Sequence, residues 1–218
     1  ARLKTDFVSN VSHELKTPLT SIRMFSDLLG SNPSAPPEKT KRYAEVIASE
    51  AARLTRLINN VLNFSRMEDG TQELKSAPLD LRSLTMDTVE QMRPQLEKDG
   101  FAIQLTLPED PVTIPGDSDA LSQVLLNLLS NAAKYGIHPD GLREAGVSLT
   151  CTGHAAVLSV SDRGPGVPRG EEQRIFEKFR RAHDSLSSGT AGSGLGLTIA
   201  RRLVEAHRGT LVYSHREG

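Results

Sequence analysis

The stretch that most constrains this chain reads Phe7-Val8-Ser9-Asn10-Val11-Ser12-His13-Glu14-Leu15-Lys16-Thr17-Pro18-Leu19-Thr20. In an α-helix, at roughly 100° per residue, one stripe collects the apolar side chains of this region, namely Val8, Val11, Leu15, Ile22 and Leu29. His13 and Thr17 lie one turn apart on roughly the opposite face. Pro18 cannot donate a hydrogen bond to the carbonyl of Glu14, so we expect the helix to bend just after the histidine. The pattern predicts a helix that packs along one side and displays a histidine on the other.

Two long helices joined by a short turn are predicted for residues 1–70. The first is expected over Leu3–Gly30 and the second over Glu38–Met67, because a proline-rich turn interrupts the chain between them. The second helix carries a stripe at heptad spacing and three residues that widen it, namely Ile47, Glu50, Leu54, Leu57, Val61 and Phe64, then Ala51, Ile58 and Leu62. One hairpin cannot bury stripes this wide, so we predict a homodimer in which two hairpins form a four-helix bundle. The alternative is a hairpin that packs against the rest of its own chain.

Beyond Gly70, short strands and helices follow one another in mixed order. Strands are expected within 71–78 and at 101–107, 112–114, 147–152, 156–161 and 210–214. Helices are expected at 79–98, from 117 or 118 to 135, at 195–207 and, as a short amphipathic segment, at 175–181, with Asp80 and Asp117 or Ser118 as N-caps. We therefore predict an all-α helical hairpin followed by an α+β two-layer sandwich, a sheet with helices on one face.

Composition excludes several classes of function. A formal net charge of -1 gives no basic field for nucleic acid, and 4% aromatic residues without tryptophan argue against stacking of single-stranded bases. The single cysteine, Cys151, excludes an internal disulfide and a cysteine metal cluster. No run approaches the roughly 18 apolar residues that a membrane span needs. Because the sequence begins at Ala1 in the middle of a predicted helix, we expect a cytoplasmic piece of a longer protein.

Residues 127–135, Asn-Leu-Leu-Ser-Asn-Ala-Ala-Lys-Tyr, carry polar side chains at helical spacing. Asn127, Asn131 and Lys134 share one side of a helix, while the leucines between them can face a core. Two amide oxygens and an ammonium suit a hydrated Mg²⁺ and phosphate oxygens. Asparagines on a helix are also common as caps or exposed polar residues, so this segment alone does not establish a site.

Two glycine-containing segments suit a nucleotide. Residues 161–168, Ser-Asp-Arg-Gly-Pro-Gly-Val-Pro, follow a predicted strand. Asp162 can accept a hydrogen bond from an exocyclic amine, and the glycines let a flat ring approach the backbone. Residues 189–197, Gly-Thr-Ala-Gly-Ser-Gly-Leu-Gly-Leu, run into a predicted helix whose first N–H groups can bind phosphate. This spacing is not that of a P-loop, because no Gly-Lys-Ser/Thr follows, and it lacks the preceding strand of a Rossmann turn.

Taken together and in order, these segments resemble those of the sensor histidine kinases of two-component systems. The matching segments are 7–29 (H-box), 127–135 (N-box), 161–168 (G1 box), 175–181, Ile-Phe-Glu-Lys-Phe-Arg-Arg (F-box), and 189–197 (G2 box). The resemblance implies a dimerisation and histidine-phosphotransfer domain, residues 1–70, and a catalytic ATP-binding domain of the GHKL ATPase type, residues 71–218. It also implies ATP and Mg²⁺ as cofactors, a homodimer, and the receiver domain of a response regulator as partner.

The resemblance implies roles for individual residues as well. His13 would take a phosphoryl group from ATP, with Glu14 accepting a hydrogen bond from the other ring nitrogen. Thr17 would orient water when the response regulator is dephosphorylated. Asp162 would take the adenine amino group, and Tyr135 would lie near the ring or sugar. Further nucleotide contacts are expected from Asn127, Asn131, Lys134, Gly164, Gly166, Phe179, Arg180, Gly192, Ser193, Gly194, Leu195, Gly196 and Leu197.

Mg²⁺ would be held by Asn131 and Asn127. Residues 182–191, which are polar and rich in serine, would form a lid over the triphosphate. Some positions depart from the family pattern: Gly136 stands where the family often has Ser or Thr, 138–145 is a long connector, and the family's last sheet strand is not found by Gly218. The resemblance also implies that this sequence is the cytoplasmic portion of a bacterial membrane-bound sensor, joined to the membrane only through segments outside this sequence.

Two other functions stay open at this point. The first is a plain ATPase or protein kinase of the same superfamily, which would share the nucleotide segments but lack a long hairpin with a displayed histidine. The second is a non-catalytic dimeric scaffold. His13 argues against the first, and intact Asn131 and Asp162 argue against the second.

Overall fold

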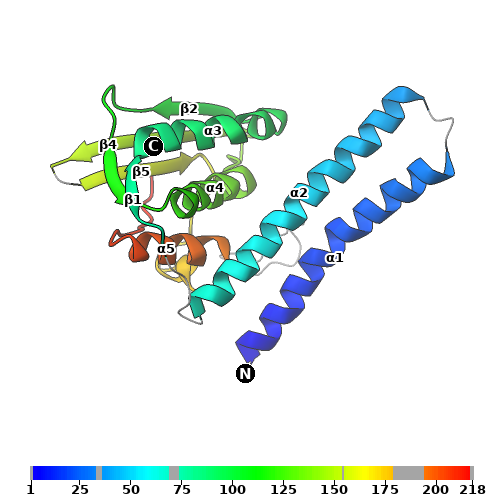
Figure 1. Ribbon diagram of the computed structural model, residues 1–218, viewed down its shortest axis with the longest axis horizontal. Helices are drawn as coiled ribbons and strands as arrows, with labels where there is room; N and C mark the ends of the chain where they lie inside the picture. Colours follow the sequence, from blue (N-terminus) through cyan, green and yellow to red (C-terminus); the bar gives the residue numbers. More distant parts are fainter. Residues whose placement is uncertain (1, 33–35, 69–73, 154, 179–193, 217–218) are drawn as a thin grey trace. The chain divides into compact units, whose positions relative to one another are not determined.

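The computed structural model describes residues 2–32, 36–68, 74–153, 155–178 and 194–216 (Figure 1). The chain divides into two compact units, one of residues 1–71 with 187–195 and one of residues 72–186 with 196–218. Within the described ranges, no helix is both long enough and apolar enough to cross a bilayer.

The first unit contains the predicted helical hairpin, made by α1 (Arg2–Ser31) and α2 (Pro37–Glu68). The described residues of the two predicted stripes include eight half-buried apolar side chains, Val11, Leu15, Ile22, Leu29, Ile47, Leu54, Leu57 and Val61. Phe25 of α1 and Tyr43 of α2 add a ring contact with centroids 5.4 Å apart. The residues predicted to widen the second stripe remain exposed, as Ile58 (44%) and Leu62 (49%) illustrate. One hairpin alone therefore leaves a large apolar surface in water.

The second unit is built on a three-stranded sheet in the order β2–β4–β5. β2 (Ala102–Thr106) runs parallel to β4 (Glu144–Thr152), which pairs antiparallel with β5 (Ala155–Asp162). A separate antiparallel pair is formed by β1 (Ala77–Asp80) and β3 (Thr113–Gly116). β4 begins earlier than predicted, so the long connector after Tyr135 is partly sheet.

Three helices accompany this sheet. α3 (Leu81–Lys98) and α4 (Ser118–Tyr135) cover one face, and α5 (Gly196–Ala206) packs beside α4 (Figure 1). A single 3₁₀ turn, η1 (Arg174–Phe176), contacts α5. The largest core cluster joins α3, α4, β4 and the start of the β2 region through Val89, Leu96, Phe101, Leu125, Leu129, Ala132, Ala145 and Val147. Helices on one face of a mixed sheet confirm the predicted α+β sandwich.

Two predicted elements are wrong. Residues 210–214 form no strand, although Leu211 and Tyr213 are half-buried and Val212 is exposed. Alternating burial records which side chains face the protein, whereas a strand also requires a ladder of hydrogen bonds with a neighbour. In place of the helix predicted at 175–181, the described residues show only the turn Arg174–Phe176. Glu177 is extended at its end, with ψ of 149°, so an i to i−4 ladder cannot continue there.

Asp117 anchors the start of α4, as its predicted N-cap. Its Oδ1 accepts hydrogen bonds from the N–H groups of Asp119 (3.0 Å) and Ala120 (3.1 Å), and its Oδ2 accepts one from the N–H of Lys75 (2.9 Å). The Asp117 N–H donates to Nε2 of His207 (3.0 Å), just after α5. Burial opposes ionisation, but the three backbone donors together outweigh it and hold the pKa of Asp117 below its usual value.

Replacing Asp117 by alanine should lower the free energy of unfolding by about 1–2 kcal/mol near neutral pH, because α4 loses its N-cap. A carboxyl whose pKa is lowered by folding contributes stability above its unfolded pKa and loses that contribution as pH falls through the folded pKa. The difference between wild type and variant should therefore shrink below about pH 4. Urea denaturation in both pH ranges measures this. Asp119→Ala removes an exposed neighbouring carboxylate and is the control; equal destabilisation by the two variants would contradict this role.

Candidate functional site

Asn127 on α4 has an unusual environment for an amide. Its side chain is buried, with 7% of the residue exposed, and its Oδ1 accepts a hydrogen bond from Nε2 of Gln123 at 3.2 Å. Its Nδ2 has no hydrogen-bond partner among the residues that the structure describes. Leaving a buried donor unpaired costs about 1–3 kcal/mol, so such a group points to a ligand that satisfies it. Gln123 was not predicted as a site residue, although its position one helical turn before Asn127 indicates that the two side chains can meet.

The same amide can serve either of two ligands. In the observed orientation Nδ2 is a donor suited to a phosphate oxygen. If the amides of Asn127 and Gln123 both rotate by 180°, Nδ2 of Asn127 can donate to the Gln123 side-chain carbonyl, and Oδ1 of Asn127 takes the unpartnered place as an oxygen ligand for Mg²⁺. Across the described ranges, His, Cys, Asp and Glu form no group of three or more that could hold a metal ion. Asn127 and the half-buried Asn131 therefore fit a Mg²⁺ ion that enters with a nucleotide and takes most of its other ligands from phosphate and water.

The carboxyl end of α4 lies directly against the end of β5. A Cβ built on Gly136 would lie 2.6 Å from Cβ of Asp162, and one built on Gly164 would lie 2.1 Å from the carbonyl oxygen of Tyr135. No side chain fits at either position, since real Cβ atoms do not approach other atoms this closely. The absence of Ser or Thr at position 136, noted as a departure from the family, therefore has a local cause: the backbone there packs on Asp162.

Asp162 is held at the end of β5 by the loop that follows it. Its Oδ1 accepts a hydrogen bond from the Gly164 N–H at 2.8 Å, and the residue is half-buried. The next residue, Arg163, pairs with Glu144 of β4 at 3.0 Å. Because Oδ1 already accepts the hydrogen bond from Gly164, Oδ2 is the carboxylate oxygen better suited to accept one from a further donor, such as an exocyclic amine.

The start of α5 also approaches α4, at Asn127. A Cβ on Gly196, the first residue of α5, would lie 3.8 Å from both Cγ and Oδ1 of Asn127. Gly194, with φ of 66°, precedes it, while Leu195 is buried and Leu197 half-buried. A helix N-terminus beside a buried unpaired amide is a combination suited to phosphate.

The F-box segment is attached to α5 by two contacts. The Thr198 hydroxyl donates to the carbonyl of Phe176 at 3.1 Å, and both residues are buried. The Arg201 guanidinium lies 5.6 Å from the centroid of the Phe176 ring. Phe176 is thus a core residue, as predicted. Segments far apart in sequence, 127–135, 161–168, 174–178 and 194–201, therefore converge around α4 and α5.

For several predicted site residues the nucleotide-binding role is not tested by the structure. Lys134 and Tyr135 are exposed at the end of α4, and Gly166 lies in the loop after Asp162 with φ of 73°. Phe179, Arg180, Gly192 and Ser193, and the lid expected at 182–191, lie outside the described residues. Their roles stay predictions.

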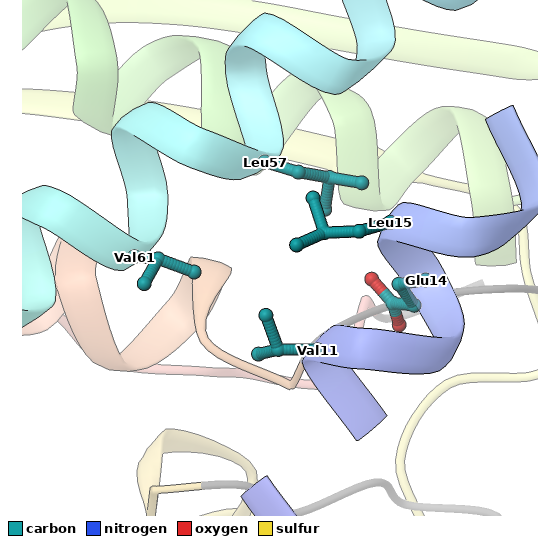
Figure 2. Close-up of a pocket in the computed structure, with 5 residues that line it drawn as sticks. All are labelled: Val11, Glu14, Leu15, Leu57 and Val61. Atoms are coloured by element: carbon teal, nitrogen blue, oxygen red, sulfur yellow. The ribbon is translucent and has the colours of Figure 1, made fainter. Parts of the chain in front are cut away.

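The predicted phospho-acceptor segment lies on α1. His13 is within the helix, but its side chain lies outside the described part of the structure, so its display to solvent stays a prediction. Thr17 is exposed, whereas Glu14 is only 5% exposed. Figure 2 shows the Glu14 carboxylate in a pocket between the helices, lined also by Val11 and Leu15 of α1 and by Leu57 and Val61 of α2. A carboxylate held among apolar side chains is costly unless it has a specific role or partner, which makes Glu14 more than a solvated neighbour of the histidine.

Comparison with known proteins places both units in known families. Residues 3–70 match the model of the His Kinase A (phospho-acceptor) domain. Residues 116–218 match the model of the histidine kinase-, DNA gyrase B-, and HSP90-like ATPase. The probable sensor histidine kinase TcrY of Mycobacterium tuberculosis is 36% identical over 215 residues, which are 97% of this chain and 43% of TcrY. The chain thus spans less than half of that relative.

Solved structures give the same result. The mycobacterial sensor histidine kinase MprB is 32% identical with a TM-score of 0.51, covering 61% of this chain and 80% of that one. Full-length ShkA in complex with AMPPNP is 30% identical with a TM-score of 0.61, covering 91% of this chain and 40% of that one. With matches to both family models and to these relatives, this chain belongs to the sensor histidine kinase family.

Proposed function

We propose that this chain is an ATP-dependent protein histidine kinase that phosphorylates His13 and passes the phosphoryl group to an aspartate of a response regulator. The observation that carries the proposal is the convergence of four nucleotide-type segments around α4 and α5, where the buried Asn127 Nδ2 has no partner among the described residues. In the same chain, α1 holds the segment around His13. We place the phosphotransfer domain at 1–70 and the catalytic ATP-binding domain at 71–218.

The nucleotide site binds ATP at both ends of the nucleotide, the adenine and the phosphates. Asp162 accepts a hydrogen bond from the adenine amino group, and the glycines at 164 and 166 leave room for the flat ring. Lys134 and the first N–H groups of α5 bind phosphate oxygens. Mg²⁺, when bound, neutralises charge on the phosphates, and the oxygens of Asn127 and Asn131 are the protein groups that would hold it.

His13 is the nucleophile. A neutral imidazole has a lone pair on one nitrogen and a proton on the other, and near neutral pH much histidine is neutral. As the new N–P bond forms, the bond from the γ-phosphorus to the bridging oxygen breaks and ADP leaves. The imidazole becomes positively charged, and the N–H of its other nitrogen donates a hydrogen bond. Glu14 accepts that hydrogen bond and stabilises the charge, and its burial favours this role because electrostatic interactions are stronger away from water.

His13 and Asp162 belong to different units, so phosphoryl transfer requires the catalytic domain to approach the hairpin. We infer that the hinge is near residues 70–78, of which 70–73 lie outside the described residues and 77–78 begin β1. We also infer, from the family alone, that the chain works on the cytoplasmic side of a membrane-bound bacterial sensor.

Incubation with γ-labelled ATP and Mg²⁺ tests the proposed function. Phosphohistidine is labile in acid and stable in alkali, so we expect protein-bound label with that behaviour, and transfer of the label when an accepting response regulator is added. Label that is stable in acid, or ATP hydrolysis without labelled protein, would contradict the proposal.

Thr17 is proposed to orient the water that removes phosphate from the response regulator. Its side chain is exposed on α1, one turn after His13. Thr17→Ala should lower phosphatase activity toward a phosphorylated response regulator by about ten- to a hundredfold, since misplacing a reacting group has effects of that size. Autophosphorylation should be unchanged. Thr20→Ala, also exposed on α1, is the control, and an equal loss of both activities in Thr17→Ala would remove the support for this role.

We propose a homodimer through the hairpin, because exposed apolar residues on α1 and α2 gather there, namely Leu19, Met24, Leu28, Ile58 and Leu62. Ile58→Glu should weaken dimerisation by about a hundredfold or more, since burying an unpaired carboxylate costs several kcal/mol. Leu142→Glu is the matched control, because Leu142 is equally exposed (47% against 44%) but lies in the other unit. Sedimentation of the three proteins measures this. A monomeric wild type, or equal dissociation in both variants, would contradict the dimer.

A further inference from the structure

The loop that carries Asp162 is held in place by a residue far along the chain. Of residues 164–168, Pro165 and Pro168 have no N–H, and the Gly164 N–H already donates to Asp162. The Val167 N–H donates to the hydroxyl oxygen of Tyr213 at 3.0 Å. Tyr213 lies after α5, in the segment predicted as a strand, and is half-buried. Its hydroxyl therefore does for this loop what a neighbouring strand would do in a sheet, which is to satisfy a backbone donor.

The contact extends beyond Tyr213. The Tyr213 hydroxyl lies 3.4 Å from Nδ1 of His215, and the two rings meet edge to face with centroids 5.1 Å apart. Nε2 of His215 lies 3.5 Å from Oε1 of Glu172, whose Oε2 accepts a hydrogen bond from the Gly170 N–H at 2.7 Å. Hydrogen bonds from backbone N–H groups, opposed by desolvation and followed by the contact with His215, lower the pKa of Glu172. The segment 167–172 is thus fixed at both ends by residues 213 and 215.

The approach of Tyr213 depends on Gly166. This residue has φ of 73°, and a Cβ at its position would lie 3.0 Å from the Tyr213 hydroxyl oxygen. Only glycine adopts this backbone region at little cost. The left-handed Gly166, the prolines at 165 and 168, and the Tyr213 hydroxyl at hydrogen-bond distance from Val167 together define one conformation of the loop.

We propose that Tyr213 is a positioning residue for nucleotide recognition, which holds the loop 164–167 so that Asp162 meets the adenine amino group. The inference rests on the proposed function, because it assumes that Asp162 reads the base. Tyr213 does not itself contact the nucleotide in this account. It acts through Val167 and Gly164, and so affects selection of the base rather than the transfer of phosphate.

Tyr213→Phe deletes the hydroxyl and keeps the ring. We expect the dissociation constant for ATP to rise about five- to tenfold, the effect of losing one hydrogen bond of a half-buried donor. The constant for GTP should hardly change, so the preference for ATP falls by the same factor. The autophosphorylation rate at saturating ATP should equal that of wild type. Amide exchange of Val167, followed by NMR without nucleotide, should quicken about five- to tenfold. Tyr43→Phe, in the hairpin, is the control and should change none of these.

Three outcomes would overturn the proposal: unchanged ATP affinity, an equal loss for ATP and GTP, or unchanged exchange at Val167. If Tyr213→Phe does not fold, His215→Phe replaces it. That variant keeps an edge-to-face ring, removes the partner of the Tyr213 hydroxyl, and should shift the ATP preference in the same direction. Failure of the proposed function is distinguishable, because the wild type would then bind neither nucleotide while the Val167 exchange still reported on Tyr213.

Discussion

Replacing His13 by glutamine is expected to abolish protein-bound phosphate and to leave ATP affinity unchanged. Glutamine is similar in size and polarity to histidine, but its amide nitrogen has no available lone pair, so no N–P bond can form. We expect ATP affinity to be preserved because the proposed nucleotide contacts belong to α4, β5 and α5 in the other unit. Incubation with γ-labelled ATP, with binding measured separately by calorimetry, gives both quantities for the same preparation.

His138→Gln is the matched control for this result. His138 lies in the loop after α4, where its Nδ1 accepts a hydrogen bond from the Asp140 N–H, and it has no part in the proposed transfer. We expect His138→Gln to label as wild type does. Residual labelling of His13→Gln, or an equal loss in the two variants, would mean that the label goes elsewhere or that any histidine replacement disturbs the protein.

Replacing Asp162 by asparagine should weaken ATP binding by about ten- to a hundredfold, which is the value of a hydrogen bond to a charged acceptor. The amide oxygen can still accept from the Gly164 N–H, so the loop is retained. The new N–H₂ group faces the adenine amino group as donor against donor. GTP has a carbonyl oxygen at that ring position, so its affinity should fall less or rise, and the ATP preference is lost.

Titration of both nucleotides into wild type and variant measures this preference. Asp140→Asn, which neutralises an exposed loop carboxylate, controls for the change in charge. If Asp162→Asn binds ATP as wild type does, or loses ATP and GTP to the same extent, then Asp162 does not recognise the base.

The two long helices and most of the sandwich could be predicted because their apolar residues repeat with helical or strand period. Asp80 and Asp117 were predicted as caps for the same reason: a cap is read from its neighbours in sequence. The strands predicted at 147–152 and 156–161 lie within β4 and β5, which pair antiparallel. Local rules sufficed wherever the deciding contacts were themselves local.

Contacts between distant residues were not predictable in this way. The bond from Asp117 to His207 and the bond from Val167 to Tyr213 join residues 90 and 46 positions apart, and no local pattern marks them. The strand prediction at 210–214 was wrong for this reason. Buried and exposed residues do alternate there, but the Tyr213 side chain bonds to the loop at Val167 and the backbone joins no sheet. Glu14 is an intermediate case: its spacing of three from Val11 places both on one helix face, and this could have indicated its burial.

The position of the phosphate tests the central claim most directly. The chain has six histidines, at positions 13, 138, 154, 183, 207 and 215, and many serines and threonines. Wild type incubated with Mg·ATP, digested and analysed by mass spectrometry at alkaline pH, should carry one phosphate per labelled chain, on His13. Phosphate on another histidine, on serine or threonine, or on no residue while ATP is hydrolysed, would contradict this account.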